Sequence, residues 1–199
     1  MIYLYGAGGH AKVIIDILEM QGNTVAGIFD DNLTKKVWNF PTLAFPGPFD
    51  FSKDELIISI GNNLIRERIS KTIANFLTAI HPSSVVSRYA SIAEGSVIMA
   101  GAIINASTTI GNHCIINTNA SVDHDCVLQD FVHISPNVTL CGDVFVGKCS
   151  HIGAGAVIIP GKKIGINSVV GAGSVVISDV QDNTVVVGNP ARFIKINNH

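Results

Sequence analysis

A histidine flanked by two carboxylates is the residue of this sequence best suited to acid-base chemistry. The segment S-V-D-H-D-C, residues 121 to 126, places His124 between two aspartates. A carboxylate beside an imidazole fixes which ring nitrogen carries the proton and stabilises the protonated ring. His124 is therefore a candidate general base, which takes a proton from an attacking nucleophile. The alternative interpretation is a solvated histidine at a turn.

A glycine-rich loop near the start of the chain is suited to binding phosphate. The sequence G-A-G-G-H spans residues 6 to 10, after the apolar stretch Ile2 to Tyr5 and before residues 11 to 20, which have helical spacing. Glycines allow the backbone to approach a phosphate closely, and a helix N-terminus offers free N–H groups and the positive end of its dipole. A second apolar stretch, residues 25 to 29, ends at Asp30 and Asp31, whose carboxylates can accept hydrogen bonds from a ribose or a base.

The glycine loop also satisfies G-x-G-x-x-A through Gly6, Gly8 and Ala11, which suggests a dinucleotide such as NAD. Only some eighty residues precede the repeats described below, and a full dinucleotide fold needs a second half of similar size. The order of strand, glycine turn, helix and strand therefore favours a single nucleotide moiety. A turn with ordinary helix capping is the alternative for each of these residues.

A period of six residues organises the rest of the chain, and it is the element that must position His124. Sixteen successive positions, six residues apart from Val86 to Val176, are all Ile, Leu or Val. Four residues after each of these anchors the side chain is usually small or β-branched, and Lys162 is the exception. A period of six matches neither a helix nor a hairpin strand, but it is typical of a triangular solenoid in which three hexapeptides form a coil of eighteen residues. The anchors predict about five coils with aliphatic side chains pointing inward.

The eighteen-residue coil predicts which residues are neighbours, since residues one coil apart stack at the strand spacing of about 4.8 Å. Gly142 is therefore expected beside His124, where its N–H could face a developing oxyanion, although a tight corner would also favour glycine. His133 lies half a coil from His124, so the two could meet only across a subunit boundary. His151 stacks on His133 without a convergent acid, and no metal site is expected.

The first part of the chain reads as a half-Rossmann-like α/β domain. Residues 32 to 54 contain Pro41, Pro46 and Pro48 and are expected to be irregular. Residues 55 to 60 are expected to form a buried strand. The sequence G-N-N at residues 61 to 63 predicts a turn, and residues 64 to 74 are expected to form a helix. We place the domain boundary near residue 81. The expected domains are residues 1–80, α/β, and residues 81–199, an all-β helix with a closing tail.

Composition narrows the choice of partner to small molecules. The chain has 199 residues, 47% of them hydrophobic and 14% charged, with a formal net charge of -2. This balance gives no basic surface for nucleic acid or for a membrane. No apolar run reaches the roughly 18 residues of a membrane helix, and the N-terminus lacks the basic region of a signal peptide, so a cytoplasmic location is expected. The four cysteines lack metal-type spacing and are expected to be reduced packing residues.

The repeat resembles a known family. Residues 86 to 179 are similar to the hexapeptide-repeat acyltransferases, and the tail V-V-V-G-N-P-A-R, residues 185 to 192, resembles their closing segment. The resemblance implies a left-handed parallel β-helix, assembly as a homotrimer, and acetyl-CoA as co-substrate in the groove between subunits.

Four motifs together resemble one subgroup, the bacillosamine-type nucleotide-linked amino-sugar N-acetyltransferases and sialic-acid O-acetyltransferase-like proteins. The motifs are G-A-G-G-H-A-K-V, F-D-D, I-G-N-N-x-I-R and V-D-H-D-C. The resemblance implies N-acetylation of a nucleotide-linked amino sugar, of UDP-4-amino-sugar type, for surface glycan synthesis. Sugar O-acetylation and a non-catalytic trimeric scaffold that binds nucleotide sugars remain the alternatives.

The resemblance also implies roles for individual residues. His124 would be the proton acceptor, and Asp125, shorter than the glutamate of the resembled enzyme, would raise its basicity. The remaining residues are expected to hold the two substrates: His133, Gly142, Ala154 and Ala172 acetyl-CoA, and Gly8, Gly9, His10, Asp30, Asp31, Gly61 and Asn117 the acceptor.

Overall fold

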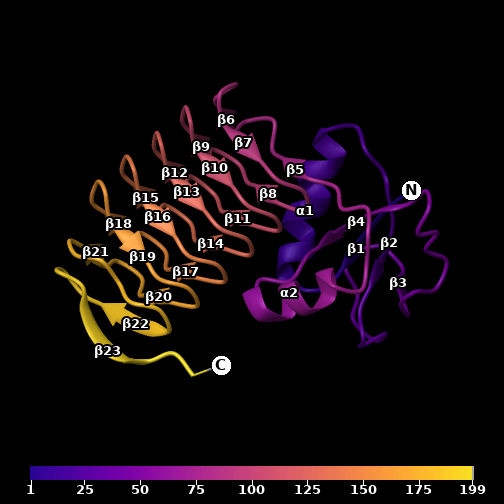
Figure 1. Cartoon of the computed structure of the whole chain (residues 1–199). Helices are drawn as coiled ribbons and strands as arrows, with labels where there is room; N and C mark the ends of the chain where they lie inside the picture. Colours follow the sequence, from indigo (N-terminus) through magenta and orange to yellow (C-terminus); the bar gives the residue numbers. More distant parts are fainter. Residues whose placement is uncertain (199) are drawn as a thin grey trace.

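The computed structural model, which describes residues 1–198, is a parallel β-solenoid with an α/β part packed against one of its faces (Figure 1). The α/β part contains a four-stranded parallel sheet in the order β3-β2-β1-β4. Its elements are β1 (Ile2–Tyr5), α1 (Gly9–Met20), β2 (Val25–Phe29), β3 (Thr42–Leu43), β4 (Glu55–Ile58) and α2 (Asn63–Ser70).

Helix α1 joins the sheet to the solenoid. Its apolar face, which includes Ile14, Ile15 and Leu18, is fully buried. The core cluster around it contains Leu4 from the sheet and Ile115 from the solenoid. One helix therefore packs against both parts, as Figure 1 also shows, and this packing fixes the glycine loop that precedes α1 relative to the solenoid.

Two details of the α/β part differ from the sequence prediction. The stretch expected to be irregular contains β3, which adds to the edge of the sheet by pairing Thr42 with Ile28 and Leu43 with Phe29. Helix α2 ends at Ser70, short of the expected residue 74. The hydroxyls of Ser70 and Thr72 donate to the carbonyls of Glu67 and Ile69 at 2.8 Å, and such side-chain bonds compete with continuation of a helix.

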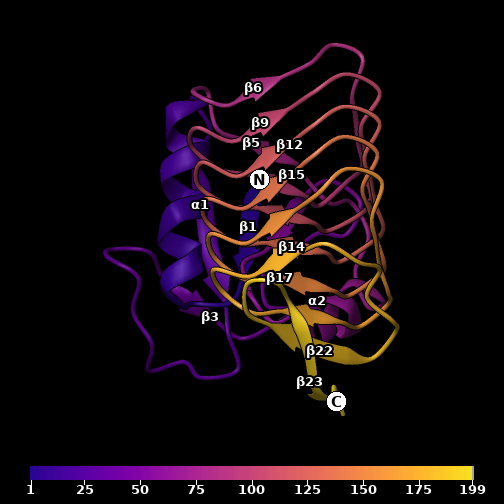
Figure 2. The same ribbon diagram turned by 90° about the vertical axis from the view of Figure 1, so that its left-hand side faces the viewer.

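The solenoid has three flat faces made of short strands stacked coil on coil, all of two residues except β22 (Figure 2). The first face consists of β5 (Ala79–Ile80), β8 (Val97–Ile98), β11 (Ile115–Ile116), β14 (His133–Ile134), β17 (His151–Ile152), β20 (Val169–Val170) and β22 (Thr184–Val187). The second consists of β6 (Val85–Val86), β9 (Ile103–Ile104), β12 (Ser121–Val122), β15 (Thr139–Leu140), β18 (Val157–Ile158) and β21 (Val175–Val176). The third consists of β7 (Ser91–Ile92), β10 (Thr109–Ile110), β13 (Val127–Leu128), β16 (Phe145–Val146) and β19 (Lys163–Ile164).

The prediction of about five coils was too low. The sheet on the first face has eight strands, and only β23 (Arg192–Ile196) pairs antiparallel, which leaves seven parallel strands. The ladder begins at Ala79, which pairs with Val97 before the first regular anchor, and it ends with β22, where the hexad spacing has been lost. The ends of the solenoid therefore lie outside the regular repeat from which the coils were counted.

The inward orientation of the anchors is confirmed. The fourteen anchors from Ile98 to Val176 are at most 1% exposed. They form one continuous core together with the small residues of the second series. No helix within residues 1–198 has the length and apolar character that crossing a membrane requires.

The chain turns each corner through a residue in the left-handed region. Fourteen such residues follow one another at intervals of six from Gly95 to Gly173. Glycine, asparagine and aspartate, which tolerate this conformation, hold most of the positions. His113, Phe131 and Cys149 also adopt this conformation, although their residue types do not favour it. These three residues stack at the corner between the third and first faces, and the rings of His113 and Phe131 are parallel with centroids 5.2 Å apart.

Candidate active site

His124, Asp123 and Asp125 lie at the corner between the second and third faces and are joined by hydrogen bonds. The His124 Nδ1 atom lies 2.7 Å from Asp125 Oδ2, and the His124 backbone N–H donates to Asp123 Oδ1 at 2.8 Å. The Asn105 side chain, one coil away from Asp123, donates to the same Oδ1 atom at 2.8 Å. A carboxylate can only accept, so Nδ1 carries the proton and the lone pair of Nε2 is left for an incoming proton.

The same acids raise the basicity of His124. Its pKa lies above the ordinary value, first because of the hydrogen bond to Asp125 and then because of the negative charge of Asp123; partial desolvation opposes them, and the charges of Asp125 and Asp143 add to the rise. The His124 side chain is 59% exposed, so substrate can reach it. The pair thus has the properties of a general base at an open corner.

Gly142 lies directly beneath the imidazole. A Cβ atom added to Gly142 would come within 2.6 Å of His124 Cε1 and 2.7 Å of Nε2. The neighbours that the eighteen-residue coil predicted are therefore in contact. Among the hydrogen bonds of residues 1–198, none uses the Gly142 N–H as donor, so this N–H is free to meet a developing negative charge.

Replacing Gly142 with alanine is expected to displace the imidazole of His124, because the added methyl group would overlap it; in an enzyme that uses this ring, misplacement by about 1 Å lowers kcat about 10- to 100-fold. The φ angle of Gly142 is not among the positive ones, so alanine fits the backbone and the fold should survive. Steady-state kinetics with a thermal melt would check both points. An unchanged kcat would show that the ring does not need its position over Gly142.

The glycine loop opens onto a cavity of about 930 Å³ at the carboxyl ends of β1, β2 and β4. Gly8, Gly9 and Gly61 line it, and a Cβ atom at any of them would meet nothing within 4 Å. Gly6 has a different role, because its φ is +115° and a Cβ there would come within 2.5 Å of Ile60. Gly6 makes the turn, and the other three leave space for a ligand.

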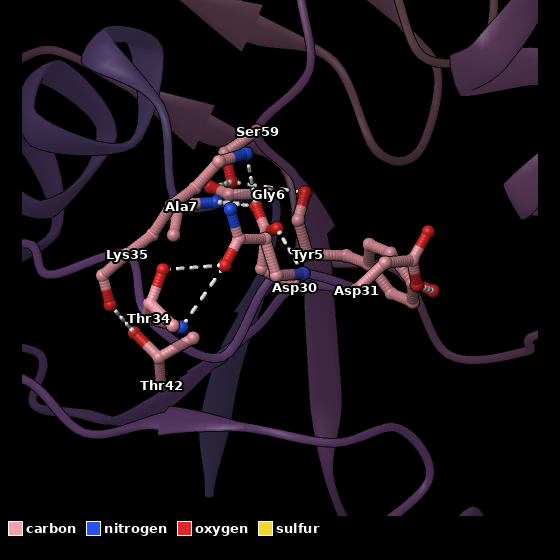
Figure 3. A network of polar contacts seen from close by, with 10 residues as sticks. Tyr5, Gly6, Ala7, Asp30, Asp31, Thr34, Lys35, Thr42 and Ser59 are labelled. Atoms are coloured by element: carbon pink, nitrogen blue, oxygen red, sulfur yellow. Dashed lines mark hydrogen bonds and ion pairs between the residues drawn. The ribbon is translucent and has the colours of Figure 1, made fainter.

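Asp30 and its neighbour Asp31 both line the cavity, but Asp30 is also bonded to the backbone of the loop (Figure 3). The Ala7 N–H donates to Asp30 Oδ2 at 2.7 Å, Lys35 Nζ lies 3.0 Å from the same atom, and the Asn32 N–H donates to Oδ1 at 2.8 Å. Burial alone would raise the Asp30 pKa, but these donors outweigh it and hold the pKa below its ordinary value.

Asp31 is exposed, and the only donor to its carboxylate among residues 1–198 is the Tyr5 hydroxyl at 3.3 Å. Its remaining lone pairs are open to a ribose or a base. From the sequence, both aspartates were expected to bind the ligand. The structure shows that Asp30 holds the loop through its hydrogen bonds, whereas Asp31 has oxygen atoms that are free to accept from a ligand.

Several cavity residues were not singled out from the sequence. They include Tyr5 and Lys35 and a set with the spacing i, i+3, i+4 and i+7, of which Ile65, Arg68 and Ile69 lie on helix α2 and Thr72 lies just after its end. That spacing was the signal that could have found the set. Arg68 and the N-terminus of α1 offer positive charge to an anionic ligand in this cavity, whereas the charge of Lys35 is paired with Asp30.

A group of neutral polar side chains lies on the first face beside the α/β part. The rings of His133 and His151 stack with centroids 4.6 Å apart, and Asn117 Nδ2 lies 3.4 Å from His133 Nε2. Burial lowers the His133 pKa to about 3, and the charges of His151, Arg66 and His10 contribute. Burial followed by the Arg66 charge lowers the His10 pKa to about 4. Near pH 7 these imidazoles are neutral, so they bind by hydrogen bonding.

Within one chain the expected residues form two separate groups. Ala154 and Ala172 are exposed at the corner between the first and second faces, where the Gly173 N–H donates to the Ala154 carbonyl at 2.8 Å. The α/β part, which contains the cavity, packs against residues of the first face such as Val97 and Ile115, whereas His124 lies at the corner between the second and third faces. A single chain therefore does not bring the base to the cavity.

Comparison with known proteins relates both parts to sugar N-acetyltransferases. Residues 1–73 match the family model described as PglD N-terminal domain. UDP-N-acetylbacillosamine N-acetyltransferase of Bacillus subtilis (strain 168) is 42% identical over 110 residues. That alignment covers 50% of this chain and 51% of the relative, so it spans about half the length of the curated protein.

Solved structures match over nearly the whole chain. PerB from Caulobacter crescentus, in complex with CoA and GDP-perosamine, has 38% identity and a TM-score of 0.91, and the match covers 98% of this chain and 97% of that one. The acetyltransferase domain of PglB from Neisseria gonorrhoeae, in complex with acetyl coenzyme A, has 35% identity and a TM-score of 0.90, with coverage of 97% and 98%.

Proposed function

We propose, from the premise that this chain belongs to the hexapeptide-repeat sugar N-acetyltransferases, that it transfers the acetyl group of acetyl-CoA to the amine of a nucleotide-linked amino sugar in surface glycan synthesis. The observation that carries the proposal is the His124–Asp125 pair directly above Gly142, in a chain whose other part has an open cavity at the glycine loop and the N-terminus of α1.

The chemistry follows from the corner. The neutral amine of the sugar attacks the thioester carbonyl, and the lone pair on His124 Nε2 removes the amine proton as the C–N bond forms. The free N–H of Gly142 stabilises the negative charge on the carbonyl oxygen of the tetrahedral intermediate. The C–S bond then breaks, and the proton held by His124 passes to the departing thiolate of CoA.

The cavity residues would bind the acceptor. Gly8, Gly9 and His10 at the N-terminus of α1 contact the diphosphate, and Asp31 accepts hydrogen bonds from the ribose or base. Asp30 acts by holding the loop, and Gly61 leaves room beside it. Asn117 faces the sugar, while His133, Gly142, Ala154 and Ala172 line the path of acetyl-CoA.

A homotrimer of left-handed β-helices would complete the site. In one chain the α/β part with its cavity packs against the first face and His124 lies at the corner between the other two, so in the proposed trimer the base that serves a cavity would come from the neighbouring subunit. We propose that residues 1–80 form the acceptor-binding domain and residues 81–199 the acetyltransferase domain.

A thiol-release assay tests the proposed function. Acetyl-CoA is supplied with UDP-, GDP- and dTDP-linked 4-amino sugars and with sialic acid, and free CoA is measured. We expect release with at least one nucleotide-linked amino sugar and none with its N-acetylated form, which has no free amine. Release with sialic acid alone would replace the proposal with sugar O-acetylation, and no release with any acceptor would contradict a transferase.

The pH dependence should shift when Asp125 is replaced with asparagine. His124 accepts a proton only when it is neutral, so kcat/KM rises as pH increases through its pKa. The Asp125 contact raises that pKa, and an amide carries no charge, so the acidic limb of the Asp125→Asn profile should move to lower pH. The control is Asp16→Asn, on the exposed side of α1. An acidic limb that stays in place would show that Asp125 does not tune His124.

A further inference from the structure

Helix α2 lies between the cavity and the solenoid and has a different set of side chains for each. Its residues that line the cavity are Ile65, Arg68 and Ile69, and Thr72 just after the helix continues this lining. The opposite face is directed to the solenoid corner formed by His113, Phe131 and Cys149, and its residues are Asn63, Arg66 and Glu67. The orientation of the cavity wall is therefore set by how α2 is attached to the solenoid.

Arg66 makes the central contact of this attachment. It is 1% exposed, and each of its five N–H groups has an acceptor between 2.8 and 3.2 Å. Nε donates to the His113 carbonyl; one terminal nitrogen donates to the carbonyls of Ile60 and Gly61; the other donates to Asn63 Oδ1 and to the Phe131 carbonyl.

The acceptors belong to both sides of the interface. Ile60 and Gly61 form the turn that lines the cavity, whereas the two corner carbonyls belong to successive coils of the solenoid. The planar guanidinium requires all of them at fixed positions, because its donors form a rigid fork. A single side chain thus ties the cavity wall to the solenoid backbone.

The contact is polar, and the charge of Arg66 has no carboxylate partner within residues 1–198. Burial lowers the Arg66 pKa to about 10, so the group remains a cation near neutral pH. Around it, Asn63 donates to the carbonyls of Cys149 and Ser150, and Glu67 pairs with Lys148 at 2.9 Å. Such bonds fix geometry more than they add stability, since burying an unpaired charge is costly.

We infer that Arg66 is a positioning residue for the acceptor: it holds the turn at Gly61 and the α2 wall of the cavity in register with the solenoid that carries the catalytic corner. The inference rests on the proposed function for its kinetic test. Arg66 itself lies behind the cavity wall, so it acts through the turn and the helix.

The test is the Arg66→Lys variant, which keeps the positive charge but lacks the planar set of five N–H donors. We expect KM for the nucleotide-linked amino sugar to rise about tenfold, the factor to which the loss of one charge-assisted hydrogen bond corresponds. The KM for acetyl-CoA should stay the same, because its expected contacts lie on the solenoid. A purely structural role would reduce the amount of active enzyme and so lower kcat, but it would leave both KM values unchanged, and that result would overturn the inference.

Calorimetric titration with UDP and GDP gives a second measurement that needs no acetyl transfer. The nucleotide that the wild type binds should bind Arg66→Lys about tenfold more weakly, and equal affinity would contradict the inference even if the chain proved not to be a transferase. Arg88→Lys is the matched control, since Arg88 is exposed and remote from α2. If Arg66→Lys fails to fold, Asn63→Ser takes its place, because it removes the hydrogen bonds to the Cys149 and Ser150 carbonyls. Weaker nucleotide binding by that variant would support the inference, and equal affinity would contradict it.

Discussion

Replacing His124 with alanine should lower kcat about 100-fold or more while the protein stays folded, because a positioned general base contributes 10²–10⁴ in typical enzymes. The ring is 59% exposed and its removal leaves no cavity in the core, so the melting temperature should change little. The measurement is steady-state thiol release with the acceptor found in the panel.

Titration of the variant with CoA separates loss of the base from loss of binding. We expect CoA to bind His124→Ala about as well as the wild type, since the expected CoA contacts are on other coils. A variant with wild-type kcat would remove His124 from the mechanism. A variant that no longer binds CoA would assign His124 to binding instead.

Replacing Ile134 with aspartate should have the largest effect on stability. Ile134 is fully buried on β14 in the centre of the solenoid core, and no donor is available to a carboxylate there. An unpaired buried charge costs about 5 kcal/mol or more in practice, which is comparable with the whole free energy of unfolding of an ordinary domain. The variant should therefore be insoluble or should melt far below the wild type.

The control for Ile134→Asp is Thr109→Asp. Thr109 is the outward residue of a two-residue strand, β10, and it is exposed, so the new charge stays in water. Circular dichroism melts of both variants test the alternation of outward and inward residues. A stable Ile134→Asp protein, or an equally damaged Thr109→Asp protein, would contradict the assignment of the anchors to the core.

The solenoid was predictable because one kind of interaction determines it. The anchors are buried apolar residues at a fixed interval. Because burial favours apolar side chains, the buried positions can be identified from residue type alone. The stacking of Gly142 beneath His124 followed from the coil length alone. Left-handed corners were harder to predict, because backbone sterics favour glycine and asparagine there but His113, Phe131 and Cys149 occupy three of them.

The cavity was predictable only in part. Its glycines and aspartates follow a motif, but the different roles of Asp30 and Asp31 depend on where the N–H groups of Ala7 and Asn32 point after folding. Arg66 shows the same limit. An arginine on a short polar helix is ordinarily expected to be solvated, and only the docking of α2 on one solenoid corner buries Arg66 and adds two backbone carbonyls to its acceptors.

The most direct test of the central claim uses acetyl-CoA with a ¹³C-labelled acetyl group and determines where the label lies in the product. With the active acceptor from the thiol-release panel, we expect NMR to place the label in an amide on the amino-bearing carbon of the nucleotide-linked sugar. A label found in an ester, or one that remains on CoA while the enzyme binds both substrates, would contradict the account.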